Sequence, residues 1–182
     1  EAVAELLRKI HGSQALLSML KRLGKKPFSP GVILEEIHER RKRFPHRVDQ
    51  LEDTLSFLTR TAGQIQFAPR VVCHCDVNHN NWLLGDDGHL YLIDWDNAVV
   101  ADPALDLGML LYSYLERKDW AKWCQRYGLE LNEDLRQRMH WYTMAQVVLF
   151  MFWHRERGET GKEEHMRRYL FRLNRDVPVS FW

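Results

Sequence analysis

Cysteine is scarce in this sequence of 182 residues, which contains only Cys73, Cys75 and Cys124. An odd number of cysteines at irregular spacing cannot build the disulfide framework of a small secreted domain. It suits a reducing compartment, so we expect a cytoplasmic protein. Long apolar runs are also missing, because none approaches the roughly 18 residues of a membrane span. The longest candidate, residues 147–153, is followed by charged residues and indicates a buried helix segment.

The sequence has no excess of charge of one sign, since its formal net charge at pH 7 is +1. That charge creates no field that would attract nucleic acid, so we expect no nucleic-acid partner. Apolar residues make up 45% and charged residues 28% of the chain, which is typical of a globular protein. At this length we expect a single domain, spanning residues 1–182, with a substantial core.

The apolar pattern predicts helices over most of the chain and a short β region in the middle. Val71–Cys73 is predicted to be a strand, and a turn at 85–88 joins two further strands, at 82–84 and 90–93, into a hairpin. The predicted helices are 1–23 with a break at Gly12-Ser13, 32–44, 48–67, 107–116, 120–127, 133–157 and 162–174. The fold class is therefore predicted to be α+β and mostly helical, with polar residues gathered on a small β insertion.

The first residues carry a helical pattern without a start signal. Val3, Leu6, Leu7 and Ile10 form an apolar stripe with helical spacing, and neither an initiator methionine nor a capping residue precedes them. The pattern predicts that the sequence is a fragment of a longer chain.

Residues with catalytic side chains follow the predicted strand Val71–Cys73. His74-x-Asp76 is followed by Asn81, and the second strand of the hairpin ends at Asp94. Hard cations such as Mg²⁺ prefer oxygen ligands, which Asn81 and Asp94 provide. Asp76 is then free to accept a proton from a hydroxyl nucleophile. A base, an amide ligand and a carboxylate ligand are what phosphoryl transfer requires of a protein, so the pattern predicts a site for that chemistry.

These motifs resemble those of the aminoglycoside phosphotransferase and choline kinase family, whose members have a protein-kinase-like fold. The resemblance is carried by HCDVNHNN at 74–81, LIDWD at 92–96 and ADPALDLG at 101–108, which match the family's HGDxxxxN, IDW[ED] and DPxxDL signatures. The loop is most similar to the YtmP/CcrZ branch of bacterial phosphotransferases, which is linked to nucleoside or ribose phosphorylation and to cell-cycle control. The resemblance covers essentially all 182 residues, as the C-terminal lobe of that fold.

The resemblance implies transfer of the γ-phosphoryl group of ATP, with Mg²⁺ as cofactor, to the hydroxyl of a small molecule. In the catalytic loop it implies Asp76 as the base and His74 as the support of the loop. It implies Asn81 and Asp94 as the Mg²⁺ ligands. The residues with an implied or suggested substrate contact are Asn78, His79, Asp96 and Tyr142, with Asp102 as a further candidate.

Other implications concern the parts around the site. Asp102 and Asp106 are implied to be structural, capping or bridging around the following helix. The ATP-gripping N-terminal lobe is absent from this sequence, because nothing resembles its glycine-rich loop or its strand lysine. We therefore expect the fragment to begin near the hinge between the two lobes.

The acceptor is left open by the motifs. The resemblance favours a nucleoside or a sugar, and the alternatives are choline or another amino alcohol, or an aminoglycoside. An alternative of another class is a non-catalytic regulatory or scaffolding module, against which the intact Asp76, Asn81 and Asp94 argue.

One departure from the family pattern is Cys75, which stands where the family usually has glycine. A thiol beside the base suggests redox sensitivity. Cys73, His74, Cys75 and His79 also suggest zinc as an alternative metal, although Cys-x-Cys is not the usual knuckle spacing and no second ligand pair follows. A Cys–His nucleophile is a further alternative, which is disfavoured because the loop offers acids rather than an oxyanion hole.

The remaining conspicuous residues have structural explanations. Trp82 and Trp95 flank the site at strand positions, and we expect them to pack in the core. The basic run at 40–43 is expected to be a solvated face rather than a phosphate site. Asp86 and Asp87 are expected to form the hairpin turn.

Overall fold

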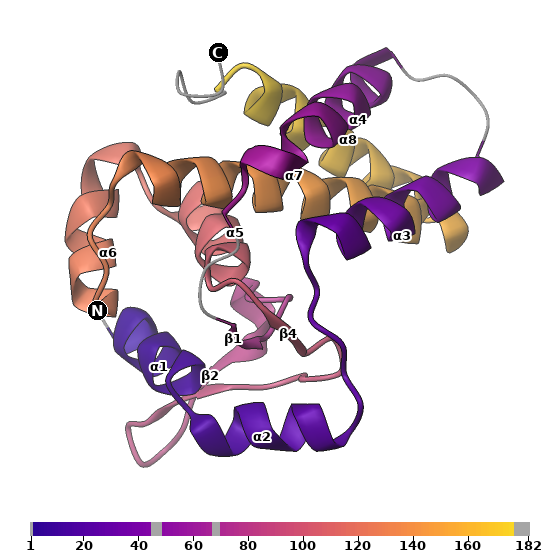
Figure 1. Cartoon of the computed structure of the whole chain (residues 1–182). Coiled ribbons are helices and arrows are strands. Elements are labelled where there is room, and N and C mark those ends of the chain that lie inside the picture. Colours follow the sequence, from indigo (N-terminus) through magenta and orange to yellow (C-terminus); the bar gives the residue numbers. More distant parts are fainter. Residues whose placement is uncertain (1, 45–48, 67–69, 177–182) are drawn as a thin grey trace.

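The computed structural model describes residues 2–44, 49–66 and 70–176. Its helices and strands, of which Figure 1 labels all but β3, are α1 (Ala2–His11), α2 (Gln14–Arg22), α3 (Pro30–Arg43), α4 (Asp49–Thr61), β1 (Val71–Cys73), β2 (Trp82–Leu84), β3 (Leu90–Leu92), β4 (Val99–Ala101), α5 (Ala104–Tyr114), α6 (Trp120–Tyr127), α7 (Glu133–Glu156) and α8 (Thr160–Asn174). The prediction of a mostly helical α+β fold is confirmed. Among these residues no helix has the length and apolar character needed to cross a membrane.

The strands of the described residues pair in two small antiparallel ladders. β2 and β3 form the predicted hairpin, in which Leu83 lies opposite Tyr91. β1 pairs with β4, with Val72 opposite Val100. The sequence pattern does not predict β4, because three apolar residues are too few to show a period. This pairing places the start of α5 beside the polar loop that follows β1.

The helix boundaries lie within three residues of the predicted ones, with one exception. The break between α1 and α2 falls at Gly12-Ser13, where the Ser13 hydroxyl accepts a hydrogen bond from the N–H of Leu16 (3.3 Å). The exception is the predicted helix 48–67, because α4 ends at Thr61 and a 3₁₀ turn follows over Ala62–Gln64. Gly63 in that turn weakens a continuing helix. Positions 48 and 67 lie outside the described residues.

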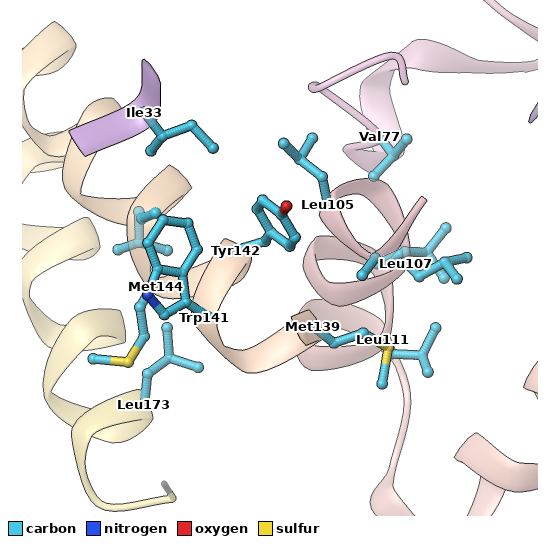
Figure 2. Close-up of a cluster of buried hydrophobic side chains, with 14 of the residues drawn as sticks. Ile33, Val77, Leu105, Leu107, Leu111, Met139, Trp141, Tyr142, Met144 and Leu173 are labelled. Carbon is cyan, nitrogen blue, oxygen red and sulfur yellow. The ribbon is translucent and has the colours of Figure 1, made fainter. Parts of the chain in front are cut away.

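The long helix α7 organises the core. Its N-cap is Asn132, whose side-chain oxygen accepts a hydrogen bond from the N–H of Leu135 (2.9 Å). The acidic residues in its first turn interact favourably with the positive end of the helix dipole. It packs most extensively against α5 and α8. Figure 2 shows the apolar side chains between these helices, including Leu107 and Leu111 from α5 and Met139 from α7. Since α5 is packed against α7, it gives a rigid support to the polar loop that follows β1 and lies beside the start of α5.

Candidate active site

The catalytic-loop residues 74–81 connect β1 to the hairpin, and the hairpin returns the chain to the same place. The N–H of Ile93 donates to the backbone oxygen of Asn81 (2.9 Å), which extends the ladder of β2 and β3 by one residue. Asp94 comes directly after Ile93. Asn81 and Asp94, thirteen positions apart in sequence, are therefore neighbours because the hairpin folds back.

Both carboxylate oxygens of Asp76 are hydrogen bonded within the loop. The side-chain amide of Asn78 donates to Oδ1 (2.6 Å), and that of Asn81 donates to Oδ2 (3.1 Å). Asn81 also donates to the backbone oxygen of Asp76 (2.8 Å). The carboxylate is half-buried. Its position is thus determined by two amide groups rather than by solvent.

The oxygen donors that a cation needs lie next to Asp76. Asn81 is 7% exposed, and with its Nδ2 directed at Asp76 its Oδ1 has no hydrogen-bond donor in the described part of the chain. Asp94 is exposed at the end of the hairpin. The amide oxygen of Asn81 and the carboxylate of Asp94 are hard oxygen donors, the type that suits Mg²⁺ rather than a soft metal.

His74 links the loop to the strand end that carries Asp94. Its Nδ1 accepts from the N–H of Asp76 (3.2 Å), so the proton lies on Nε2, which donates to the backbone oxygen of Ile93 (2.8 Å). The ring is buried and meets the edge of Trp95 at 4.7 Å between centroids. Both nitrogens are occupied by the backbone, so His74 supports the loop rather than exchanging protons with a substrate.

Asp106 of α5 anchors the backbone at the start of the loop. Its buried carboxylate accepts from the N–H of His74 (2.7 Å) and from the N–H of Cys75 (2.8 Å). A third hydrogen bond comes from Nε2 of His11 at the end of α1 (3.1 Å), and Nδ1 of His11 meets the hydroxyl of Tyr127 (2.7 Å). Burial, followed by nearby Cys73 and Asp106, raises the pKa of Tyr127, so this hydroxyl stays protonated and donates to His11.

His11 and Tyr127 are residues that the sequence pattern does not reveal. They lie 95 and 21 positions from Asp106, and no motif spacing connects them. Only the packing of α1 and α6 beside β1 and α5 brings their side chains to the carboxylate.

Asp102 holds the two core helices together. Its buried carboxylate accepts from the N–H of Ala104 (2.8 Å) at the start of α5 and from the guanidinium of Arg138 on α7 (2.7 and 2.9 Å). Asp102 has no exposed surface, so the suggestion that it touches a substrate is wrong. The capping and bridging role is what the structure shows.

Cys75 and Asp94 share an uncommon backbone conformation. With φ of +66° and +64°, they are the non-glycine residues with positive φ in the described ranges. Such strain concentrates where the surrounding structure imposes it, often at functional sites. Here the two positions flank Asp76 and Asn81, one at each end of the site.

Comparison with known proteins identifies the family of the chain. Residues 1–142 match the model of the phosphotransferase enzyme family. The chain therefore belongs to the phosphotransferase enzyme family. The YtmP/CcrZ branch, a finer assignment, stays a prediction.

Solved structures of other phosphotransferases share the fold. Choline kinase LicA from Streptococcus pneumoniae superposes with a TM-score of 0.69 at 18% identity, covering 93% of this chain and 62% of that protein. A choline/ethanolamine kinase family protein from Mesorhizobium loti gives 0.70 at 20%, covering 94% and 57%. The GDP and kanamycin complex of APH(2")-IIia gives 0.73 at 14%, covering 96% and 61%. This phosphotransferase-family chain thus spans about three-fifths of these neighbours.

The positive φ at position 75 explains why the family pattern suggests glycine there, where this chain has Cys75. Glycine adopts this conformation without strain, and cysteine adopts it here because Asp106 binds its N–H. Burial, followed by the charges of Asp106 and Asp76, raises the pKa of the Cys75 thiol well above its usual value. Little reactive thiolate forms, which argues against the suggested redox sensitivity.

The alternative zinc set does not form in this phosphotransferase-family chain. The thiol of Cys73 donates to the backbone oxygen of Asp102 (3.3 Å), and both nitrogens of His74 are occupied. Among the described residues, one group of three or more histidine, cysteine, aspartate or glutamate side chains has its ligand atoms within 4.8 Å of one another, namely His11, Cys73 and Asp106, all buried. His11 and Asp106 are already hydrogen bonded to each other, so hydrogen bonding explains why these side chains lie close together.

The residues with a suggested substrate contact are not all at the site. Asn78 and His79 belong to the loop, and the N–H of His79 donates to the Tyr114 hydroxyl (3.1 Å). Asp96 is exposed two residues after Asp94. Tyr142 is 0% exposed and lies in the core between α5 and α7, as Figure 2 shows, so the suggestion that it reaches a pocket is wrong. The physical reason is that this face of α7 is covered by α5.

The remaining expectations concern packing and charge. Trp82 and Trp95 pack against the core, and their indole N–H groups donate to the backbone oxygens of Val77 and Leu92. Each basic residue of the run 40–43 has an acidic partner, as expected of a solvated face. A cavity of about 520 Å³ lies between α3 and α4, where Arg41 pairs with Glu52, and it shares no residue with the catalytic loop.

Proposed function

We propose that the protein containing this chain is an ATP-dependent small-molecule kinase that transfers the γ-phosphoryl group to a substrate hydroxyl. The observation that carries the proposal is the Asp76 carboxylate, held by two amides beside the oxygen donors of Asn81 and Asp94. Phosphoryl transfer needs positioning and charge neutralisation more than covalent chemistry, and this arrangement supplies both.

Each residue has a distinct task in this proposal. Asp76 orients the acceptor hydroxyl and takes its proton as the bond to phosphorus forms. Asn81 and Asp94 hold Mg²⁺, which when bound neutralises charge on the phosphates of ATP. His74 and Asp106 keep the loop backbone in place, so that the base stays close to the metal ligands.

An apolar surface beside the metal ligands supports ATP as the donor. One face of the hairpin carries the side chains of Leu83, Tyr91 and Ile93, because alternate residues of a strand point to the same face. They are 49%, 46% and 40% exposed. This face ends at Asp94, so a purine lying on it would direct its phosphates toward the cation ligands. Complexes with AMP and GDP are known for two structural neighbours.

The acceptor is the finer part of the proposal. We favour a nucleoside or a sugar, with an added role in cell-cycle control, on the similarity of the loop to the YtmP/CcrZ branch. Choline, ethanolamine and kanamycin are named for neighbours whose identity to this chain is 20% or less, so they are the alternative acceptors to test.

The decisive experiment removes the charged residues of the site one at a time from the full-length protein. Asp76→Ala and Asp94→Ala are expected to lower ADP release at least about a hundredfold, because the base and a metal ligand are lost. Chelation of Mg²⁺ should abolish it. ADP release is measured over a panel of nucleosides, sugars, amino alcohols and aminoglycosides.

Asp86→Ala is the matched control, because Asp86 is an exposed carboxylate in the turn of the same hairpin. It should leave turnover unchanged. Full turnover in Asp76→Ala would refute the assignment. If the cellular phenotype survived both site substitutions, the non-catalytic scaffold would be favoured instead.

A further inference from the structure

Asn78 has an amide group that is fixed at both ends. Its Oδ1 accepts from the N–H of Asn80 (2.9 Å), which caps the 3₁₀ turn His79–Asn81, and its Nδ2 donates to Oδ1 of Asp76 (2.6 Å). If the amide were reversed, Nδ2 would face the N–H of Asn80 and Oδ1 would face the carboxylate of Asp76, and neither pair can form a hydrogen bond. The network therefore determines the orientation of the amide.

Asn81 alone does not determine the orientation of the Asp76 carboxylate. Its Nδ2 is shared between Oδ2 of Asp76 at 3.1 Å and the backbone oxygen of Asp76 at 2.8 Å. The contact from Asn78 is the shorter one and lies on the other carboxylate oxygen. With one amide on each oxygen, rotation of the carboxylate breaks at least one hydrogen bond.

We propose that Asn78 is the positioning residue for the base Asp76. It turns the carboxylate so that the lone pairs left free on it meet the acceptor hydroxyl. This role rests on the proposed function, and it replaces the substrate contact suggested by the sequence, because both ends of the amide are engaged within the loop. Misplacing a reacting group by about 1 Å costs on the order of a hundredfold in rate.

The test separates the two hydrogen bonds of Asn78, the one that its Oδ1 accepts from Asn80 and the one that its Nδ2 donates to Asp76. In the full-length protein, Asn78→Ser keeps an oxygen that can cap the N–H of Asn80 but cannot reach Asp76. Asn78→Asp keeps the cap and sets a second carboxylate against Asp76. Both are expected to lower kcat about ten- to a hundredfold, with KM for ATP and acceptor unchanged. Asn78→Ser should also keep the melting temperature, whereas repulsion between the two carboxylates should lower it in Asn78→Asp.

Asn80→Ser is the matched control, because Asn80 is exposed and its side chain has no hydrogen-bond partner among the described residues. It should keep wild-type kcat. The proposal is overturned if both Asn78 variants keep kcat within about twofold, since an unplaced base would cost more. A rise in acceptor KM at unchanged kcat would also overturn it, because that result indicates a substrate contact.

A spectroscopic readout distinguishes failure of this role from failure of the proposed function. The side-chain amide resonances of Asn78 are followed by ¹⁵N NMR in the wild type and in Asp76→Ala. The substitution should shift them and speed their exchange with water, whether or not any substrate is phosphorylated. Unchanged resonances would overturn the positioning role, whereas absence of ADP release in the wild type would overturn the proposed kinase alone.

Discussion

Cys75 illustrates how single residues are held in strained conformations at this site. A non-glycine residue at a φ of +66° costs about 1–2 kcal/mol relative to the ordinary helical region. The hydrogen bond from its N–H to Asp106 offsets this cost, since Asp106 would otherwise be a buried carboxylate with fewer donors. The thiol itself has no catalytic contact in the described structure.

Cys75→Gly is therefore expected to have a free energy of unfolding within about 1 kcal/mol of the wild type. The relieved strain is offset by the greater backbone entropy of glycine in the unfolded chain. Cys75→Val should be less stable than Cys75→Gly by about 2 kcal/mol, because a β-branched residue tolerates positive φ poorly. Urea denaturation measures both.

Cys75→Ala serves as the control for that comparison, since it keeps the Cβ while removing the thiol. It should lie between the other two variants. Equal stability of the glycine and valine variants would show that the positive φ carries no strain.

At the scale of elements, the close contact of α5 with α7 depends on Gly108. A Cβ at this position would lie 2.6 Å from the backbone oxygen of Met139 and 2.5 Å from the hydroxyl of Thr143. A backbone oxygen cannot move aside without shifting α7. The glycine thus permits the close packing through which α7 supports Asp106, two residues earlier on α5.

Gly108→Ala should lower the free energy of unfolding by about 1–3 kcal/mol, although alanine is the better helix former. The matched control is Gly161→Ala on α8, where a Cβ would meet nothing within 4 Å. That change should stabilise the protein by about 0.5–1 kcal/mol. If thermal and urea unfolding showed Gly108→Ala to be the stabilised variant, the close contact would be refuted.

At the scale of the whole molecule, the core encloses a histidine that stays neutral. His140 is fully buried on α7, and its Nδ1 lies 2.9 Å from the hydroxyl of Tyr112. Burial, followed by the charge of Arg117, lowers the pKa of His140 from 6.5 to about 3. The unfolded chain therefore binds a proton between these pH values that the folded chain does not bind.

This difference predicts that stability is complete above pH 6.5 and falls as the pH is lowered toward 3. For a single group, the slope is at most about 1.4 kcal/mol per pH unit. His140→Asn, which keeps an acceptor for Tyr112, should make the free energy of unfolding less dependent on pH in this window. His165→Asn, on the exposed surface of α8, is the control and should leave the slope unchanged.

At the scale of the whole molecule, the surface proposed for ATP lies on the exposed face of the hairpin. Leu83 and Ile93 offer an exposed apolar face, and we propose that the N-terminal lobe implied by the family resemblance closes over it. If so, the isolated 182 residues should bind ATP weakly and turn over poorly, because that lobe would form the other half of the cleft. Isothermal titration calorimetry measures this, and micromolar affinity would contradict the two-lobe proposal.

The sequence by itself determined most of the helices, the hairpin and the choice of Asp76, Asn81 and Asp94 for the proposed site. Helical periodicity, Gly12-Ser13 and the hairpin turn act through neighbours a few residues apart, so their signals are local. The spacing from Asp76 to Asn81 and the strand that leads to Asp94 are local in the same sense. Their geometry follows once the hairpin closes.

The tertiary structure alone decided which distant groups support that site and which are buried. His11, Asp106 and Tyr127 meet because α1, α5 and α6 come together in the folded chain. No spacing or motif in the sequence predicts that contact. β4 becomes a strand only when β1 offers it a partner. Tyr142 is covered by α5, because burial is a property of the neighbours that folding brings, not of the residue itself.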